Sequence, residues 1–152
     1  MKWLLRLLAA LIAFVVSLTL VGYSLPVAHV ASRSAELNAP PEQVFTLVSE
    51  VKNYGSWWPE GTETKVAIVE SVPPSRFVTK IDEPDAPFGG TWTMEIVPIP
   101  TGSRLTITER GEIYNPIFRA LARFAFGYGG TIASCLDAAG RRLGVTSGAA
   151  PR

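Results

Sequence analysis

The sequence predicts an α+β protein in which an antiparallel sheet of about five strands wraps around a long C-terminal helix, preceded by an N-terminal transmembrane helix. Three patterns support this: an apolar run at the N-terminus, alternating segments between residues 64 and 113, and a helical period after residue 115. A chain of 152 residues suffices for one compact domain with a short extension. We therefore expect an anchor at 1–26, one domain at 27–144, and a small, polar, disordered tail at 145–152.

The composition excludes several kinds of partner. The net charge is +1, so neither a basic surface for nucleic acid nor an acidic tail is indicated. The single cysteine, Cys135, excludes an intramolecular disulfide and a multi-cysteine zinc site, and the single histidine, His29, excludes a multi-histidine metal centre. We expect no metal, no cofactor and no nucleic acid.

The run LLRLLAALIAFVVSLTLVGYSL at residues 4–25 has about the ~20 residues that a helix needs to cross a bilayer. A cleaved signal peptide and a buried core helix are alternatives, but the sequence before Arg33 offers no small-x-small cleavage site. Lys2 and Arg6 favour an N-terminus on the inside of the cell membrane. The expectation is a single-pass membrane protein with its domain outside the cytoplasm.

Residues 27–37 alternate weakly and predict a first strand. The sequence NAPPEQ at 38–43 supplies prolines at a helix start and an acid in the first turn, which predicts a short amphipathic helix over about 41–50. Gly55 and Pro59 then break the helical pattern. A second short helix or a turn is expected to present the aromatic residues Tyr54, Trp57 and Trp58.

Alternating segments follow, separated by proline and glycine clusters, and predict four strands in meander order. The apolar residues of the last hairpin share one face only in a register that brings Trp92 opposite Glu109. That register places a carboxylate at the rim of an apolar face and turns Glu95 to the opposite face, which argues against a carboxylate pair. The four segments are residues 64–72, 75–83, 91–97 and 103–113.

From Asn115 the sequence predicts one long helix. Asn115 followed by Pro116 is a cap with proline at the first helical position. Apolar residues then recur at steps of three and four up to residue 143, without a change of phase at the glycine cluster 127–130. This cluster lacks the preceding strand and the lysine of a phosphate-binding loop, so its glycines are expected to permit a bend or close packing. Arg119 and Arg123 are expected on a solvated face.

Two segments carry a family resemblance. SRSAELNAPPEQVFTLVSEVKNYGSWWP, beginning at Ser32, and FGGTWTMEIVPIPTGSRLTITERGEIYNPIFRALARFAFG, beginning at Phe88, resemble the START-like helix-grip superfamily of polyketide cyclase/dehydrase and lipid-transport proteins, in its membrane-anchored bacterial form. Relatives carry two more strands after the tryptophan–proline turn. The resemblance therefore implies a reduced sheet and a grip that is open on one side.

The resemblance also implies a hydrophobic pocket between the sheet and the C-terminal helix. It carries over no catalytic triad. A lone histidine beside the anchor and a cysteine without a neighbouring histidine are interpreted as structural residues. The residues whose matched positions are expected to line the pocket are Trp58, Trp92, Met94, Ile107, Phe118 and Tyr128.

Three functions follow from the sequence. The first is non-catalytic binding of a lipid or other hydrophobic small molecule by a membrane-anchored domain. The second is a cyclase or dehydratase that uses Glu109 or Tyr114 as acid or base. The third is a protein-interaction module, because a shortened sheet exposes an edge strand that can pair with a partner.

Overall fold

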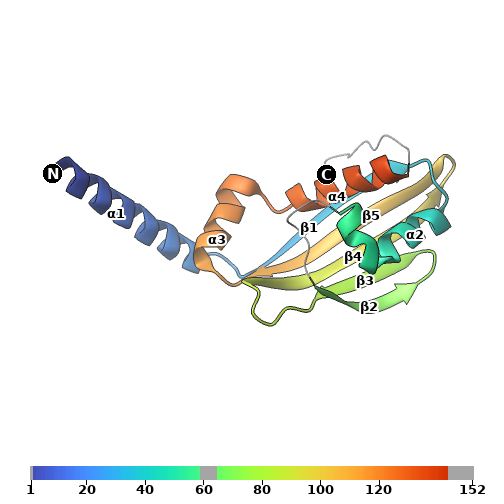
Figure 1. The fold of residues 1–152 in the computed structure, drawn as a ribbon, viewed down its shortest axis with the longest axis horizontal. Coiled ribbons are helices and arrows are strands. Elements are labelled where there is room, and N and C mark those ends of the chain that lie inside the picture. The colour runs from blue at the N-terminus through green and yellow to red at the C-terminus, as the bar shows by residue number, and fades with distance from the viewer. Residues whose placement is uncertain (1, 59–64, 144–152) are drawn as a thin grey trace.

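The computed structural model describes residues 2–58 and 65–143, as a curved sheet with helices on one face and a long helix extending from one end (Figure 1). The helical elements are α1 (Lys2–Ser24), α2 (Pro41–Ser49), the 3₁₀ helix η1 (Val51–Ser56), α3 (Pro116–Leu121), the π-helical turn η2 (Ala122–Phe126) and α4 (Gly130–Arg142). The strands are β1 (Ala28–Leu37), β2 (Val66–Val72), β3 (Arg76–Ile81), β4 (Phe88–Ile99) and β5 (Gly102–Ile113).

The strands form one antiparallel sheet in the order β1-β5-β4-β3-β2, so the first strand pairs with the last. The predicted α+β class with a five-strand sheet is confirmed for the described residues. Trp92 lies opposite Glu109, which is the register that the apolar pattern of this hairpin predicted. Alternation fixes this register because a slip of one residue would turn the apolar side chains to the other face.

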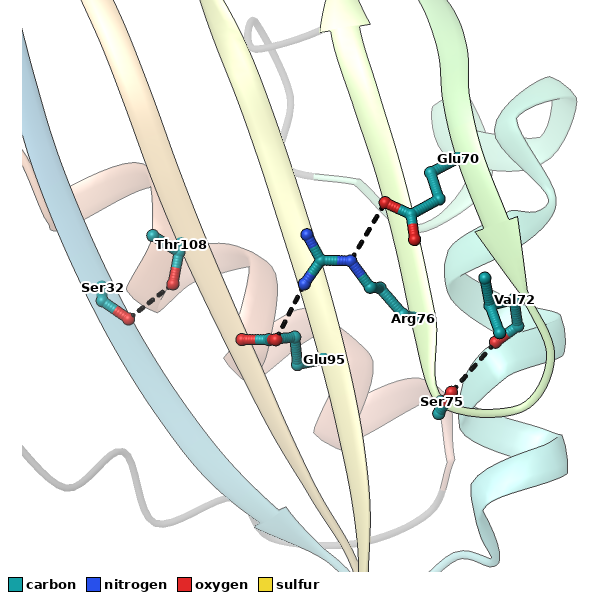
Figure 2. Close-up of polar contacts among 7 residues, drawn as sticks. All are labelled: Ser32, Glu70, Val72, Ser75, Arg76, Glu95 and Thr108. Carbon is teal, nitrogen blue, oxygen red and sulfur yellow. Dashed lines mark hydrogen bonds and ion pairs between the residues drawn. The ribbon is translucent and has the colours of Figure 1, made fainter.

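The two faces of the sheet differ in chemistry. Figure 2 shows polar side chains on the face turned away from α2 and α4, where Arg76 pairs with Glu70 and Glu95 and Ser32 bonds to Thr108. Helix α2 packs on β3, β4 and β5, and α4 packs on β1 and β5. The apolar face is therefore the one under the helices.

The core lies between this apolar face and the two helices. Its side chains come from alternate positions of the strands, from one face of α2 and from one face of α4, and they bury apolar surface that drives folding. Tight packing at these positions makes the sheet and α4 one unit. The largest of them are Leu37, Val44, Val48, Phe77, Met94, Leu105, Ile107, Ile132 and Leu136.

The prediction of one continuous C-terminal helix is wrong. The chain is helical up to Phe126, leaves the helix at Gly127 with a φ of 72°, and resumes as α4 at Gly130. A positive φ is a conformation that glycine adopts without steric cost, so this residue permits the break. The apolar stripe is real in α4, but the preceding helical segment turns away from the sheet to contact α1.

Among the described helices, only α1 is long and apolar enough to cross a membrane. None of its most apolar stretch is buried against the rest of the protein. A signal sequence would have the same length and composition. The C-terminal turn of α1 packs closely against α3. A Cβ built on Gly22 would lie only 1.8 Å from the carbonyl oxygen of Pro116. Glycine is thus the residue that allows the two backbones to meet.

Arg119 does not lie on a solvated face, contrary to the prediction. It is 6% exposed, and its guanidinium donates to the carbonyl oxygens of Gly22 and Leu25 at the end of α1 and of Ile113 and Tyr114 at the end of β5. A cation is favourable at a helix C-terminus, where carbonyls lack intrahelical partners. One side chain therefore ties α1, β5 and α3 together. The prediction for the tail, 145–152, lies outside the described residues.

Candidate functional site

A cleft of about 1050 Å³ opens between the sheet, η1 and the segment that joins η2 to α4. All five strands contribute to its lining, together with α3 and η2. Since α3 and η2 leave the sheet, the end of the sheet nearest α1 is not covered by α4. The lining residues that matter most here are His29, Tyr54, Trp58, Thr79, Phe88, Trp92, Glu109, Phe118, Phe126 and Tyr128.

Aromatic rings form one wall of the cleft. The rings of Tyr54 and Trp58 stack at 4.4 Å between centroids, and Trp58 meets Trp92 at 5.4 Å. Tyr54 is held by a hydrogen bond from its hydroxyl to the carbonyl of Val48 in α2. Such a wall offers a rigid apolar surface with few polar groups, which suits an apolar ligand.

Polar side chains adjoin this wall, since Glu109 is the register partner of Trp92. His29 Nε2 lies 3.8 Å from Glu109 Oε1, and the imidazole stacks on Tyr128 with centroids 4.1 Å apart. Gly111 makes room for the imidazole, since a Cβ at this position would lie 2.4 Å from His29 Cε1. The antiparallel pairing of β1 with β5 brings these residues together, because His29 is the register partner of Gly111.

Burial shifts the pKa values of His29 and Glu109 in the direction that disfavours the charged form of each. Burial raises the pKa of Glu109 above its usual 4.5, against a smaller opposing effect of a hydrogen bond from Trp92. Burial also lowers the pKa of His29 below its usual 6.5. A neutral imidazole and a carboxyl that holds its proton more tightly than usual can both donate and accept hydrogen bonds.

The structure divides the residues that were predicted to line the pocket. Trp58, Trp92, Phe118 and Tyr128 line the cleft. The other two predicted positions do not reach it, because Met94 and Ile107 are fully buried in the core. They face α2 and α4 farther along the strands, where the helices close over the sheet.

The two candidate acid–base residues separate. Glu109 lies in the cleft, whereas Tyr114 does not line it and donates instead to the carboxylate of Glu112 at 2.8 Å. That hydrogen bond is the main cause of a raised pKa of the Tyr114 hydroxyl. The opposite-face prediction for Glu95 is confirmed, since its carboxylate pairs with Arg76 at 2.9 Å on the polar face.

Sequence reasoning missed His29, Tyr54, Phe88 and Phe126 as lining residues. Pairing the first strand with the last would have indicated His29, because a glycine opposite a large ring in a sheet marks space for that ring. Cys135 is buried as predicted, and burial is the largest cause that raises its thiol pKa to about 12. Within residues 2–58 and 65–143, no cluster of three histidine, cysteine or acidic side chains is placed to hold a metal ion.

Glu109→Gln should make the protein more stable at alkaline pH. Because the folded-state pKa of Glu109 is raised, the wild type loses stability as the pH rises from the unfolded value of about 4.5 through the folded one. Glutamine does not ionise and can still accept a hydrogen bond. Thermal unfolding at pH 4 and pH 8 should show the variant melting higher than the wild type only at pH 8. Glu95→Gln on the exposed face is the control, and an equal gain there would contradict the explanation.

Searches against protein-family models and against curated proteins found no match. Solved structures do match. A START superfamily protein from Mycobacterium smegmatis aligns with a TM-score of 0.59 and 18% identity over 76% of this chain and 97% of that chain. A conserved protein from Geobacillus kaustophilus aligns with a TM-score of 0.60 and 12% identity, over 76% and 95%.

A third match is the di-domain ARO/CYC StfQ of the steffimycin biosynthetic pathway, with a TM-score of 0.54 and 14% identity over 78% of this chain and 53% of that one. At such identities the likeness concerns the fold and not the ligand. Together with the antiparallel sheet and the C-terminal helix packed on its apolar face, these matches show that this chain has the START-like helix-grip fold.

Proposed function

We propose that this protein binds a hydrophobic small molecule or lipid in the cleft, without transforming it, while α1 anchors it in the membrane. The observation that carries the proposal is the cleft of about 1050 Å³, which has an aromatic wall and, beside Trp92 of this wall, the polar pair His29 and Glu109. Ligand pockets of roughly 300–1,000 Å³ with few, well-placed polar groups are the usual form of small-molecule sites.

The polar pair His29 and Glu109 would orient the ligand. An acyl chain or ring system would lie along Trp58 and Trp92, and a hydroxyl or carbonyl group would reach His29 and Glu109. Because burial disfavours the charged forms of both groups, they suit an uncharged polar group better than an anion.

The proposed setting is the cell membrane, with the N-terminus inside and the domain outside the cytoplasm. Helix α1 has the length and composition for one span, and Lys2 and Arg6 lie at its beginning. A reporter enzyme fused after Arg152 checks the orientation, and a reporter active only in the cytoplasm would overturn it.

The direct test of binding is lipid extraction and native mass spectrometry of the full chain purified in mild detergent. We expect a bound apolar molecule that is retained through purification. Trp58→Ala and Trp92→Ala should each weaken binding of the fluorescent fatty acid cis-parinaric acid by roughly tenfold, since a buried aromatic contact is worth about 1–2 kcal/mol.

Val97→Ala is the matched control, because Val97 is exposed on the same strand as Trp92 but lies outside the cleft. Its affinity for cis-parinaric acid should equal that of the wild type. A protein that is consistently empty after purification, and that binds the probe no better than either tryptophan variant does, would refute the proposal.

One observation favours an enzyme as the second candidate. His29 and Glu109 are 3.8 Å apart in the cleft, and such a pair could pass a proton to or from a bound substrate. Glu109→Gln separates the two functions. It should abolish turnover of an aromatic polyketide substrate in an enzyme, because an amide cannot transfer a proton, and it should largely preserve ligand retention in a binding protein, because the amide still donates and accepts hydrogen bonds.

The third hypothesis, an interaction module, depends on the sheet edge. β2 is an edge strand with exposed Ile68, Val69 and Val72, but its pairing with β3 shifts between Ile68 and Glu70. An irregularity of this kind twists an edge strand and opposes the addition of another strand. The edge therefore supports this hypothesis less well than the cleft supports binding.

A further inference from the structure

We infer that α3 and η2 together form a membrane-surface segment, residues 116–126, that sits in the headgroup layer of the bilayer and holds the mouth of the cleft against the lipid. The inference rests on the proposed anchoring by α1, and it adds a second point of contact with the membrane. The inference specifies the route by which a ligand enters the cleft, from the lipid rather than from water. The presence of a cleft does not by itself identify this route.

The membrane-surface segment exposes three aromatic side chains. Phe118, Phe124 and Phe126 are 53%, 71% and 75% exposed, so the described part of the chain leaves more than half of each in contact with solvent. Arg123 is exposed among them. Aromatic rings beside an arginine on a short amphipathic segment are the composition that partitions into a lipid interface, where the rings enter the apolar layer and the guanidinium meets phosphate.

The depth of this segment follows from its contacts with α1. Pro116 touches Gly22, and Arg119 donates to the carbonyls of Gly22 and Leu25 at 3.2 and 2.9 Å. Gly22 is in the last turn of α1, so at about 1.5 Å per residue α3 begins within a few ångströms of the end of the spanning helix. That end marks the boundary between hydrocarbon and headgroups.

The direction of the segment agrees with its depth. In Figure 1, α3 runs crosswise to α1 and leaves the sheet on the side where α1 ends. If α1 lies near the bilayer normal, α3 and η2 extend along the membrane surface. The six residues of α3 and the five of η2 are too short to cross a bilayer, and they suit a position within its interface.

The mouth of the cleft coincides with this surface. Phe118 and Phe126 are exposed and also line the cleft, together with the partly exposed Phe88 at the start of β4. A lipid or an apolar molecule dissolved in lipid could therefore pass between these rings into the cleft without crossing water. This removes the main barrier to transfer, which is the exposure of apolar surface to water.

The experiment measures the depth of single labelled positions in the full chain. In a Cys135→Ala background, Phe124→Cys and Val97→Cys are each labelled with the fluorophore NBD and reconstituted into vesicles of equal parts phosphatidylcholine and phosphatidylglycerol. Val97 is exposed and lies about 30 Å along β4 from Phe88. Lipids that carry a doxyl quencher near the headgroup end report contact with the interface.

We expect the label at position 124 to lose most of its fluorescence to the quencher and the label at position 97 to lose little. Equal quenching at the two positions, in protein that floats with the vesicles, would overturn the inference while leaving the proposed binding function untouched. A blue-shifted but unquenched label at 124 in cross-linkable dimers would assign the surface to a second copy and also overturn it. Protein that does not float would refute the anchoring and this inference with it.

Discussion

Arg119→Ala is expected to destabilise the junction between α1 and the domain by roughly 3–5 kcal/mol. A hydrogen bond from a charged donor contributes about 1.5–3 kcal/mol, and a buried acceptor left without a partner costs about 1–3 kcal/mol, although such effects do not add fully. Arg119 donates hydrogen bonds to four carbonyl oxygens at once, at the end of α1 and at the end of β5. Its loss leaves several of them without a donor at a buried site.

The measurement is thermal unfolding in detergent together with limited proteolysis of the link at Leu25–Val27. Arg119→Ala should melt lower and be cut faster there. Arg119→Lys should recover only part of the loss, because an ammonium group cannot match the planar set of donors of a guanidinium. Arg123→Ala is the matched control, since Arg123 is exposed and such changes stay within about 0.5 kcal/mol. Equal behaviour of the two alanine variants would contradict the role given to Arg119.

Ile107→Ala is the second change with a large expected effect, a loss of about 2–5 kcal/mol in the free energy of unfolding. Ile107 is 1% exposed and lies opposite Met94, so the substitution leaves a void between two strands and α4. Although the family resemblance suggested both positions as pocket residues, neither touches the cleft. Chemical denaturation should show the loss, and the folded fraction should bind cis-parinaric acid as tightly as the wild type.

Val97→Ala again provides the control, because it removes the same kind of side chain from an exposed position of the neighbouring strand. It should change the unfolding free energy by less than about 0.5 kcal/mol. If Ile107→Ala instead weakened probe binding without lowering stability, the assignment of Ile107 to the core would be wrong.

Local patterns predicted most of the fold. The cap at Asn115 is present, with its side chain accepting from the backbone N–H groups of Ile117 and Phe118 at 2.9 and 3.2 Å. Alternation predicted the strands and the register of β4 with β5, because a two-residue period leaves a single choice of buried face. These features depend on neighbours in sequence or on one hairpin, so a single sequence contains them.

Contacts between distant segments were not predictable in this way. The apolar residues after residue 115 have the spacing of one continuous helix. This spacing does not show which part of the protein the apolar face of the helix will contact. Helix α4 packs on the sheet whereas α3 packs on α1, and Gly127 makes the change of direction possible. Arg119 looked like a surface residue because arginine seldom lies buried, and only the approach of α1 supplies the carbonyls that satisfy it.

The candidate site shows the same division. Trp92 and Glu109 were placed correctly by the hairpin register, whereas His29 required knowledge that β1 pairs with β5 across 82 residues of sequence. Phe126 was missed for a similar reason, since it becomes a lining residue where the C-terminal helix breaks. These lining residues therefore follow from contacts between distant segments, and no local sequence motif predicts them.

The break at Gly127 also divides the molecule mechanically. One body is the sheet with α2 and α4. The other is α1 with α3 and η2, in which Arg119 of α3 donates to the carbonyls of Gly22 and Leu25 at the end of α1. Within the described chain, three short backbone links join them, at Leu25–Val27, at Tyr114–Asn115 and at Gly127–Gly129. The cleft lies along the seam, with walls from both bodies. In the proposed membrane setting, a change in the angle between α1 and the sheet would change the width of this cleft, and so the tilt of α1 would bear on the size of the molecule that the cleft admits.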